Sequence, residues 1–202
     1  YLRFQLHQFY SLAIKSFKII KNKSQRTYLI NSLNSGDGKS FICNGLVVAF
    51  STINKKVLLI DFDLRKNGSH LLDTDNNEIL GINDYLLNSN LEIDQLIQNR
   101  SCNGIDYDVI TSGTQTSFIN LLDNKRLDDF FKEVKSIYEV IVIDTPPLGV
   151  IADSVSLEKY SDNTMFILNL DNLTSYNLIE INTLTDQNFS NIKYILNNNI
   201  FL

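Results

Sequence analysis

Six runs of apolar residues alternate with polar segments along the chain, and each run has the length of a short buried strand. They cover residues 27–33, 56–62, 107–112, 139–145, 164–170 and 192–198. Several runs are apolar at consecutive positions, as in VIVI at 140–143, rather than at every second position. Such runs are typical of parallel strands that are covered on both faces. The pattern therefore predicts a mainly parallel sheet.

Helical periodicity marks some of the segments between these runs. Apolar residues recur three and four positions apart in two places, namely Ile42, Leu46, Ala49, Phe50 and Ile53, and Leu127, Phe130, Phe131, Val134, Ile137 and Tyr138. A further helix is expected at about residues 5–21, with one stripe formed by Leu6, Phe9, Tyr10, Ala13, Phe17 and Ile20. We interpret this stripe as core packing, and a partner-binding face is the alternative.

Strands that alternate with helices indicate an α/β fold, and we expect residues 1–202 to form a single domain. Region 66–105 is rich in Asn and Asp and is the least regular part of the chain. It is expected to contain loops and two short helices. No segment has the composition of a linker that would divide the chain.

The composition narrows the class of protein. Of the 202 residues, 44% are hydrophobic and 20% are charged, which is typical of a folded protein. The net charge of −5 argues against a surface that coats nucleic acid, because such a surface needs clustered Lys and Arg. The two cysteines, Cys43 and Cys102, lie far apart, so we expect a reducing cytosolic compartment and neither a disulfide nor a zinc site. No apolar run approaches the ~18 residues of a membrane helix.

A glycine-rich segment, NSGDGKSF at residues 34–41, follows the first expected strand and precedes a periodic helix. It matches the end of the phosphate-binding pattern G-x-x-x-x-G-K-[ST], although Leu33 stands where the first glycine is expected. Its two glycines would let backbone N–H groups turn toward a phosphate at the start of the helix. Lys39 would reach the β- and γ-phosphates, and the Ser40 hydroxyl would bind Mg²⁺. A glycine-rich turn that only begins a helix is the alternative.

Two later strands end in carboxylates. The strand in VLLIDFDLR is followed by Asp61 and Asp63, and the strand in VIVIDTPP ends at Asp144, before the only two prolines of the chain. Ligands of open parallel sheets bind at the carboxyl ends of the strands, so these acids are expected to face the glycine-rich loop, with Asp61 and Asp63 on one side. One acid could accept a proton while others orient Mg²⁺. Ordinary solvated carboxylates in turns are the alternative.

The three segments together resemble the bacterial tyrosine kinases known as BY-kinases. The resemblance covers nearly the whole chain, with smaller matches at RKNGSH (65–70), VITSG (109–113) and VIADSVSL (150–157). It implies an α/β fold of the P-loop NTPase type, similar to that of MinD. This fold is a three-layer sandwich with a mainly parallel central sheet. It also implies an enzyme that phosphorylates tyrosine with ATP and Mg²⁺.

The resemblance assigns a role to each matching residue. It implies a catalytic set of Lys39, Asp61, Asp63 and Asp144, in which Asp61 is the expected base. It implies metal binding by Ser40, Asp61 and Asp144. It implies nucleotide binding by Ser35, Gly36, Asp37, Gly38, Lys39, Ser40, Phe41 and Asn197. Asn197 matches a position near the adenine, and an ordinary loop Asn is an equal alternative.

The chain departs from the family in several places. The Glu-x-x-Arg-x-x-Arg helix that helps to build ring-shaped oligomers would fall near His7, Tyr10 and Ala13, and none of them matches. Whether the chain forms a homo-oligomer is left open, but we do not expect assembly through that motif. Asn34 replaces the extra lysine of MinD-type ATPases, which disfavours a MinD-like ATPase. The family usually continues into a tyrosine cluster, for which Tyr194 is a poor substitute.

The resemblance also implies a cellular setting. We expect a cytoplasmic domain at the inner face of the bacterial cell membrane, acting in capsule or exopolysaccharide synthesis. Its expected partner is a membrane-anchored polysaccharide chain-length regulator, on the same polypeptide or on a separate chain. No nucleic-acid partner is expected. A regulatory module that binds ATP without transferring phosphate is the alternative function, and a MinD-like P-loop ATPase is a second one.

Overall fold

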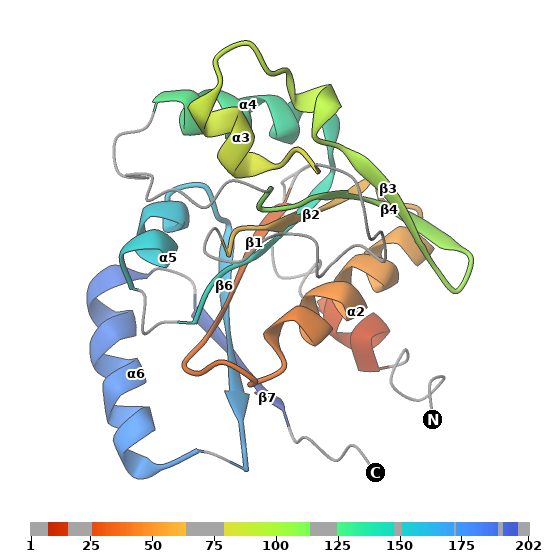
Figure 1. The fold of residues 1–202 in the computed structure, drawn as a ribbon. Coiled ribbons are helices and arrows are strands. Elements are labelled where there is room, and N and C mark those ends of the chain that lie inside the picture. Colours follow the sequence, from red (N-terminus) through yellow and green to blue (C-terminus); the bar gives the residue numbers. More distant parts are fainter. Residues whose placement is uncertain are drawn as a thin grey trace.

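One sheet of seven strands runs through the described part of the molecule (Figure 1). The computed structural model describes residues 8–15, 26–63, 79–113, 125–147, 151–171, 173–189 and 192–197. The strand order is β3-β4-β2-β5-β1-β6-β7, and every neighbouring pair is parallel except β3 and β4. The strands are β1 (Arg26–Ser32), β2 (Val57–Asp61), β3 (Gln98–Cys102), β4 (Ile105–Ile110), β5 (Val140–Asp144), β6 (Asn163–Asn169) and β7 (Ile192–Asn197).

All six predicted strands are confirmed, with their ends shifted by one or two residues. The continuous apolar runs arise because each central strand is buried on both faces. In β2, for example, Leu58 and Ile60 belong to the core on one face of the sheet, whereas Val57 and Leu59 belong to the core on the other face. The inference from consecutive apolar residues to a parallel sheet covered on both sides is therefore confirmed.

The strand β3 is a correction to the expectation for region 66–105. Its sequence, QNRSC, has no apolar run, and its residues alternate between half-buried and exposed because it lies at the edge of the sheet. It pairs with β4 through a turn at Asn103 and Gly104, whose φ angles are +53° and +77°. Asn-Gly is the favoured pair for such tight hairpin turns, so this local signal could have predicted the strand.

The two short helices expected in the same region are confirmed. They are α3 (Ile82–Leu87) and the 3₁₀ helix η2 (Ile93–Gln95). Part of the region, residues 66–78, lies outside the described residues, as do Arg65 and His70 of the RKNGSH match.

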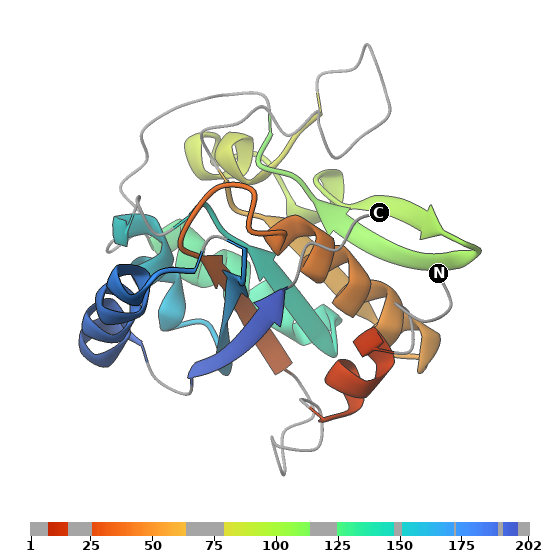
Figure 2. The ribbon, with the colours of Figure 1, turned by 90° about the horizontal axis from the view of Figure 1, so that it is seen from below.

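Helices cover both faces of the sheet and complete three layers (Figures 1 and 2). One face carries α2 (Lys39–Thr52) and the helix of residues 8–15. The other face carries α3, α4 (Lys125–Ile137), α5 (Ile151–Glu158) and α6 (Ser175–Asn188). The predictions for α2 and α4 are confirmed. The sequence analysis missed α5 and α6; α6 is rich in Asn and Thr and has no clear apolar stripe.

The N-terminal helix is described over residues 8–15, and the rest of the predicted range of 5–21 lies outside the described residues. Ala13 is completely buried in the core on the α2 face, and Phe9 and Leu12 pack against that core. The interpretation of the apolar stripe as core packing is confirmed for two of its members, Phe9 and Ala13. None of the helices in the described ranges combines the length and the apolar character that a membrane crossing needs.

Candidate functional site

The glycine-rich loop of residues 33–38 connects β1 to α2 at the carboxyl end of the sheet. Gly36 and Gly38 have φ angles of +88° and +89°, in the left-handed region that side chains other than glycine's rarely adopt. A Cβ atom at Gly36 would meet nothing within 4 Å, so the backbone conformation rather than space requires a glycine there. The loop is tied internally by the Ser32 hydroxyl, which donates to the carbonyl oxygen of Asn34 at 3.0 Å.

A hollow of about 250 Å³ opens above this loop. Its lining residues are Ser32, Ser35, Gly36, Gly38, Lys39, Ser40, Phe41 and Pro147. The first turn of α2 borders the hollow and contains no acidic residue that would offset the partial positive charge of the helix N-terminus. The arrangement suits an anion such as a phosphate group. Six of the lining residues were predicted from the sequence; Ser32 and Pro147 were missed, because they fall outside the loop pattern itself.

Asp37 and Asn197 are turned toward the protein and are not among the lining residues. The Asp37 Oδ2 accepts a hydrogen bond from the Asn34 N–H at 2.8 Å. Burial raises the pKa of this carboxyl, while the Asn34 N–H and the Lys39 charge oppose the rise. The Asn197 Nδ2 donates to the Asp37 carbonyl oxygen at 2.8 Å and so links the edge strand β7 to the loop. A direct nucleotide contact by either residue stays a prediction.

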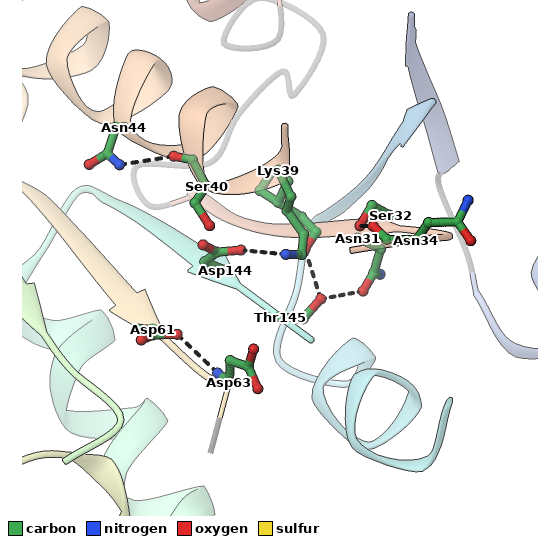
Figure 3. Close-up of polar contacts among 11 residues, drawn as sticks. Asn31, Ser32, Asn34, Lys39, Ser40, Asn44, Asp61, Asp63, Asp144 and Thr145 are labelled. Atoms are coloured by element: carbon green, nitrogen blue, oxygen red, sulfur yellow. Dashed lines mark hydrogen bonds and ion pairs between the residues drawn. The ribbon is translucent and has the colours of Figure 1, made fainter. Parts of the chain in front are cut away.

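The acidic residues meet where β2 and β5 end side by side (Figure 3). Asp61 lies directly opposite Asp144 in the register of these parallel strands, and both are buried. Asp63 follows the end of β2, and its N–H donates to Asp61 Oδ1 at 3.0 Å. Leu58, Ile60 and Phe62 all belong to the core on one face, so the alternation continues past the end of β2 and leaves the buried Asp61 and Asp63 on the opposite side, as predicted. The structure thus brings together the three carboxylates that the sequence predicted.

Lys39 completes the cluster from the other side. Its Nζ lies 3.3 Å from Asp144 Oδ1, and the two side chains are only 11% and 10% exposed. Figure 3 shows the Lys39 side chain directed across the loop toward the end of β5. Because the pair is largely removed from water, its electrostatic interaction is screened less than that of a surface pair. A phosphate group in the hollow would offer Lys39 a second anionic partner.

The oxygen donors near the cluster fit Mg²⁺. Figure 3 shows the Ser40 side chain directed toward Asp144, while the Ser40 carbonyl oxygen accepts from Asn44 Nδ2 at 2.9 Å. Hydroxyl and carboxylate oxygens are the hard ligands that Mg²⁺ prefers, usually together with phosphate oxygens. The described ranges contain no group of three His, Cys, Asp or Glu side chains arranged as a metal cage. Metal binding by Ser40, Asp61 and Asp144 stays a prediction.

Two polar side chains that the sequence analysis missed fix the position of the end of β5. The buried Thr145 Oγ1 lies 2.8 Å from the Ile30 carbonyl oxygen and 2.5 Å from Asn31 Oδ1, and it donates to these acceptors on β1. Asn31 is itself buried, directly before the loop. The contact sets Asp144 relative to the loop. A polar residue within the apolar run YLIN was the signal that could have marked Asn31.

Cys43 lies on α2 one turn after Lys39 and is completely buried. Burial is the main reason that the pKa of its thiol is raised well above the usual value, and the nearby charge of Asp144 adds to the rise. The thiol is therefore protonated and uncharged at neutral pH, and its side-chain hydrogen bond with Asp144 places it beside the charged cluster.

Comparison with known proteins supports this description. Residues 25–200 match the family model described as AAA domain. The chain is 29% identical over 146 residues to a putative tyrosine-protein kinase in the cps region of Klebsiella pneumoniae, covering 72% of this chain and 20% of that protein. It is 31% identical over 148 residues to the tyrosine-protein kinase YwqD of Bacillus subtilis, covering 73% of this chain and 61% of that protein. The resemblance that the three motifs predicted is confirmed.

Solved structures share the fold. The kinase domain of the Escherichia coli tyrosine kinase ETK superposes with a TM-score of 0.81 at 24% identity, covering 96% of this chain and 75% of that one. The septum site-determining protein MinD from Pyrococcus horikoshii superposes with a TM-score of 0.60 at 20% identity, covering 85% and 70%. The predicted fold class, a MinD-type P-loop sandwich, is therefore confirmed.

Proposed function

The chain belongs to the AAA domain family, and from this premise we propose that it is an ATP-dependent protein-tyrosine kinase domain. The observation that carries the proposal is the buried cluster in which Lys39 meets the acidic ends of two neighbouring strands beside the glycine-rich loop. Three separate segments of the chain supply these charges. The tyrosine-protein kinases among its relatives support the choice of tyrosine as the acceptor.

Each residue of the site would have a separate role in phosphoryl transfer. The loop N–H groups and Lys39 would hold the β- and γ-phosphates and stabilise the charge that develops on them. Asp61 would accept the proton of a tyrosine hydroxyl. The tyrosine oxygen then forms a bond to the γ-phosphorus while the bond between the γ-phosphorus and the ADP oxygen breaks. Asp63 holds Asp61 through its N–H. Mg²⁺, held by Ser40 and Asp144 with Asp61 nearby, would shield the phosphate charge.

The relatives also suggest a setting. The Klebsiella pneumoniae relative is named for a cps region, and we infer a role of this chain in capsule or exopolysaccharide synthesis. We further infer a place at the cytoplasmic face of the membrane, beside a membrane-anchored polysaccharide chain-length regulator on the same polypeptide or a separate chain. The chain spans 20% to 61% of the lengths of the two curated relatives, so the partners of the whole protein remain part of this proposal.

Transfer of labelled phosphate tests the proposal. The chain is incubated with γ-labelled ATP, Mg²⁺ and a peptide that carries clustered tyrosines, and label on tyrosine is measured. Asp61→Asn should lower the rate about 10²- to 10⁴-fold, because a general base contributes that much. Asp106→Asn, the same chemical change at an exposed position of the β3–β4 hairpin, should leave the rate unchanged.

The alternative functions give different results in the same assay. Nucleotide binding without any label on tyrosine would sink the kinase proposal and favour a regulatory ATP-binding module. Release of labelled phosphate to water without transfer would instead favour an ATPase of the MinD type.

A further inference from the structure

The helix of residues 8–15 lies against α2, as both views of the ribbon show (Figures 1 and 2). Ala13 is completely buried in the core that α2 shares with the sheet, and Phe9 and Leu12 pack against the same core. The helix is thus a fixed part of this face of the molecule. It contacts the helix whose first turn forms the wall of the hollow.

Phe9 lies directly on the backbone of α2 at Gly45. A Cβ atom at Gly45 would come within 2.4 to 2.5 Å of three carbon atoms of the Phe9 ring, which no real contact allows. Gly45 has no left-handed φ angle, so the backbone conformation does not require a glycine here. The missing side chain is therefore needed for space. Inside a helix a glycine is less favourable than alanine, and the close approach of Phe9 is the physical reason that this position tolerates it.

The same ring supports Phe41. Phe41 lies four residues before Gly45, on the same face of α2, and its ring meets that of Phe9 edge to face with centroids 5.5 Å apart. Phe41 is 39% exposed and lines the hollow together with Lys39 and Ser40. One aromatic contact therefore joins the N-terminal helix to the wall of the phosphate site.

We propose that Phe9 is a positioning residue for nucleotide binding, which it supports by holding Phe41 in the wall of the hollow. The inference rests on the proposed nucleotide site. Loss of the Phe9 ring would remove one of the contacts that restrict the Phe41 rotamer, and binding would have to restrict the side chain further at a cost in entropy. Phe9 lowers that cost in advance because Gly45 lets its ring approach closely enough to contact Phe41.

Equilibrium binding of Mg²⁺-ADP, measured by titration calorimetry on the full chain, tests the proposal. Phe9→Ala should weaken affinity about threefold to tenfold, the range expected for the loss of one aromatic contact. Gly45→Ala should weaken it similarly, because its new Cβ displaces the Phe9 ring. Leu12→Ala is the matched control, since it removes apolar packing of the same helix from the same core. It should lower the melting temperature and leave the affinity unchanged.

A double-mutant cycle decides whether the effect passes through Phe41. In a Phe41→Ala background, Phe9→Ala should cause no further loss of affinity. An equal loss in both backgrounds, or an equal loss with Leu12→Ala, would mean that the helix acts only by stabilising the fold, and it would overturn the proposal. Unchanged affinity in Phe9→Ala would overturn it as well.

The outcome is independent of the kinase proposal. A chain whose ADP affinity depends on Phe9 but that never labels tyrosine supports this inference and contradicts the proposed activity. A chain that labels tyrosine but binds ADP equally well without the Phe9 ring does the reverse.

Discussion

The two ends of the central strands carry ion pairs of the same kind in different surroundings. At the amino end, Lys55 Nζ lies 2.7 Å from Glu139 Oε1, and the side chains are 27% and 42% exposed. At the carboxyl end, Lys39 Nζ and Asp144 Oδ1 are farther apart, at 3.3 Å, but the two side chains are only 11% and 10% exposed. The shorter pair is therefore the more solvated one, and the longer pair is the one beside the candidate site.

The two pairs differ chiefly in burial, and burial determines how strongly water screens each of them. Water screens the pair at the amino end, and exposed pairs contribute little to stability. At the carboxyl end the described residues bring three buried carboxylates and one ammonium together. Their excess negative charge is costly in the interior and favours binding of a cation. The sheet thus has a solvated ion pair at its amino end and a buried group of charges at its carboxyl end.

Removal of the two lysines should give the largest contrast. Lys39→Met should lower tyrosine phosphorylation about 10²- to 10³-fold, because it removes a preorganised charge at the phosphates. Lys55→Met, the same change at the amino end, should leave the rate unchanged. Initial rates with labelled ATP measure both, and thermal melting monitored by circular dichroism checks that the variants fold. Equal losses in the two variants would break the proposed contrast between the ends.

Neutralising the two acids should have the next largest effect. Asp144→Asn should weaken the Mg²⁺-dependent part of ADP binding about 10- to 100-fold, as the loss of a group that supports a metal site typically does. Glu139→Gln should leave that part intact. Calorimetric titrations with and without Mg²⁺ separate the two contributions. If the unaltered chain and Asp144→Asn both bound ADP equally well with and without Mg²⁺, Asp144 would have no role at the metal.

A neutral contact at the carboxyl end sharpens the comparison. Thr145→Val should destabilise the fold by about 1–3 kcal/mol, because the buried Asn31 Oδ1 loses the hydroxyl donor, whereas the Ile30 carbonyl oxygen keeps the Thr145 N–H as a donor. Thr52→Val removes a hydroxyl that bonds to the Val48 carbonyl oxygen within α2, where the helix already supplies a partner, and should cost less. Chemical denaturation measures both changes. A larger loss for Thr52→Val would show that burial at the site contributes no special stability.

The smallest expected effect is the pH dependence of the stability that the Lys55–Glu139 pair contributes at the amino end. The Lys55 ammonium, followed by the Lys56 N–H, holds the pKa of the Glu139 carboxyl below its usual value. A carboxyl whose pKa is lowered by folding stabilises the protein above its unfolded pKa, and this stability is lost as the pH falls through the folded pKa. Because the Glu139 side chain is 42% exposed and its charge is screened by water, the contribution should be no more than about 1 kcal/mol. Denaturation of Glu139→Gln and the unaltered chain should therefore differ at pH 7 and converge below about pH 4.

Much of the site could be predicted because its signals are local. A glycine-rich loop between a strand and a helix, and carboxylates at strand ends, are readable in short segments, and parallel topology places them at one edge of the sheet. The contacts of Asp37 and Asn197 could not be predicted in this way. Whether Asp37 faces a ligand or its own loop depends on the fold of that loop, and the Asn197 contact joins positions 160 residues apart.

The strand β3 and helix α6 show the same limit in the fold. Neither has an apolar period of its own, and each is held by a neighbour. The burial of Ile181 from α6 is a tertiary event that local pattern does not encode. The Asn-Gly turn before β4 was the one local signal that could have indicated the missing strand.

The sequence by itself determined the alternation of strands and helices, the phosphate-binding loop and the acids at the ends of β2 and β5, because periodicity and turn chemistry act over a few residues. Only the tertiary structure decided that β2 and β5 are neighbours, so that Asp61 and Asp144 lie in register. It also decided that Lys39 reaches Asp144 and that Phe9 packs over Gly45 against Phe41. These contacts depend on strand order and helix packing, which arise from the burial of the whole chain rather than from any short segment of it.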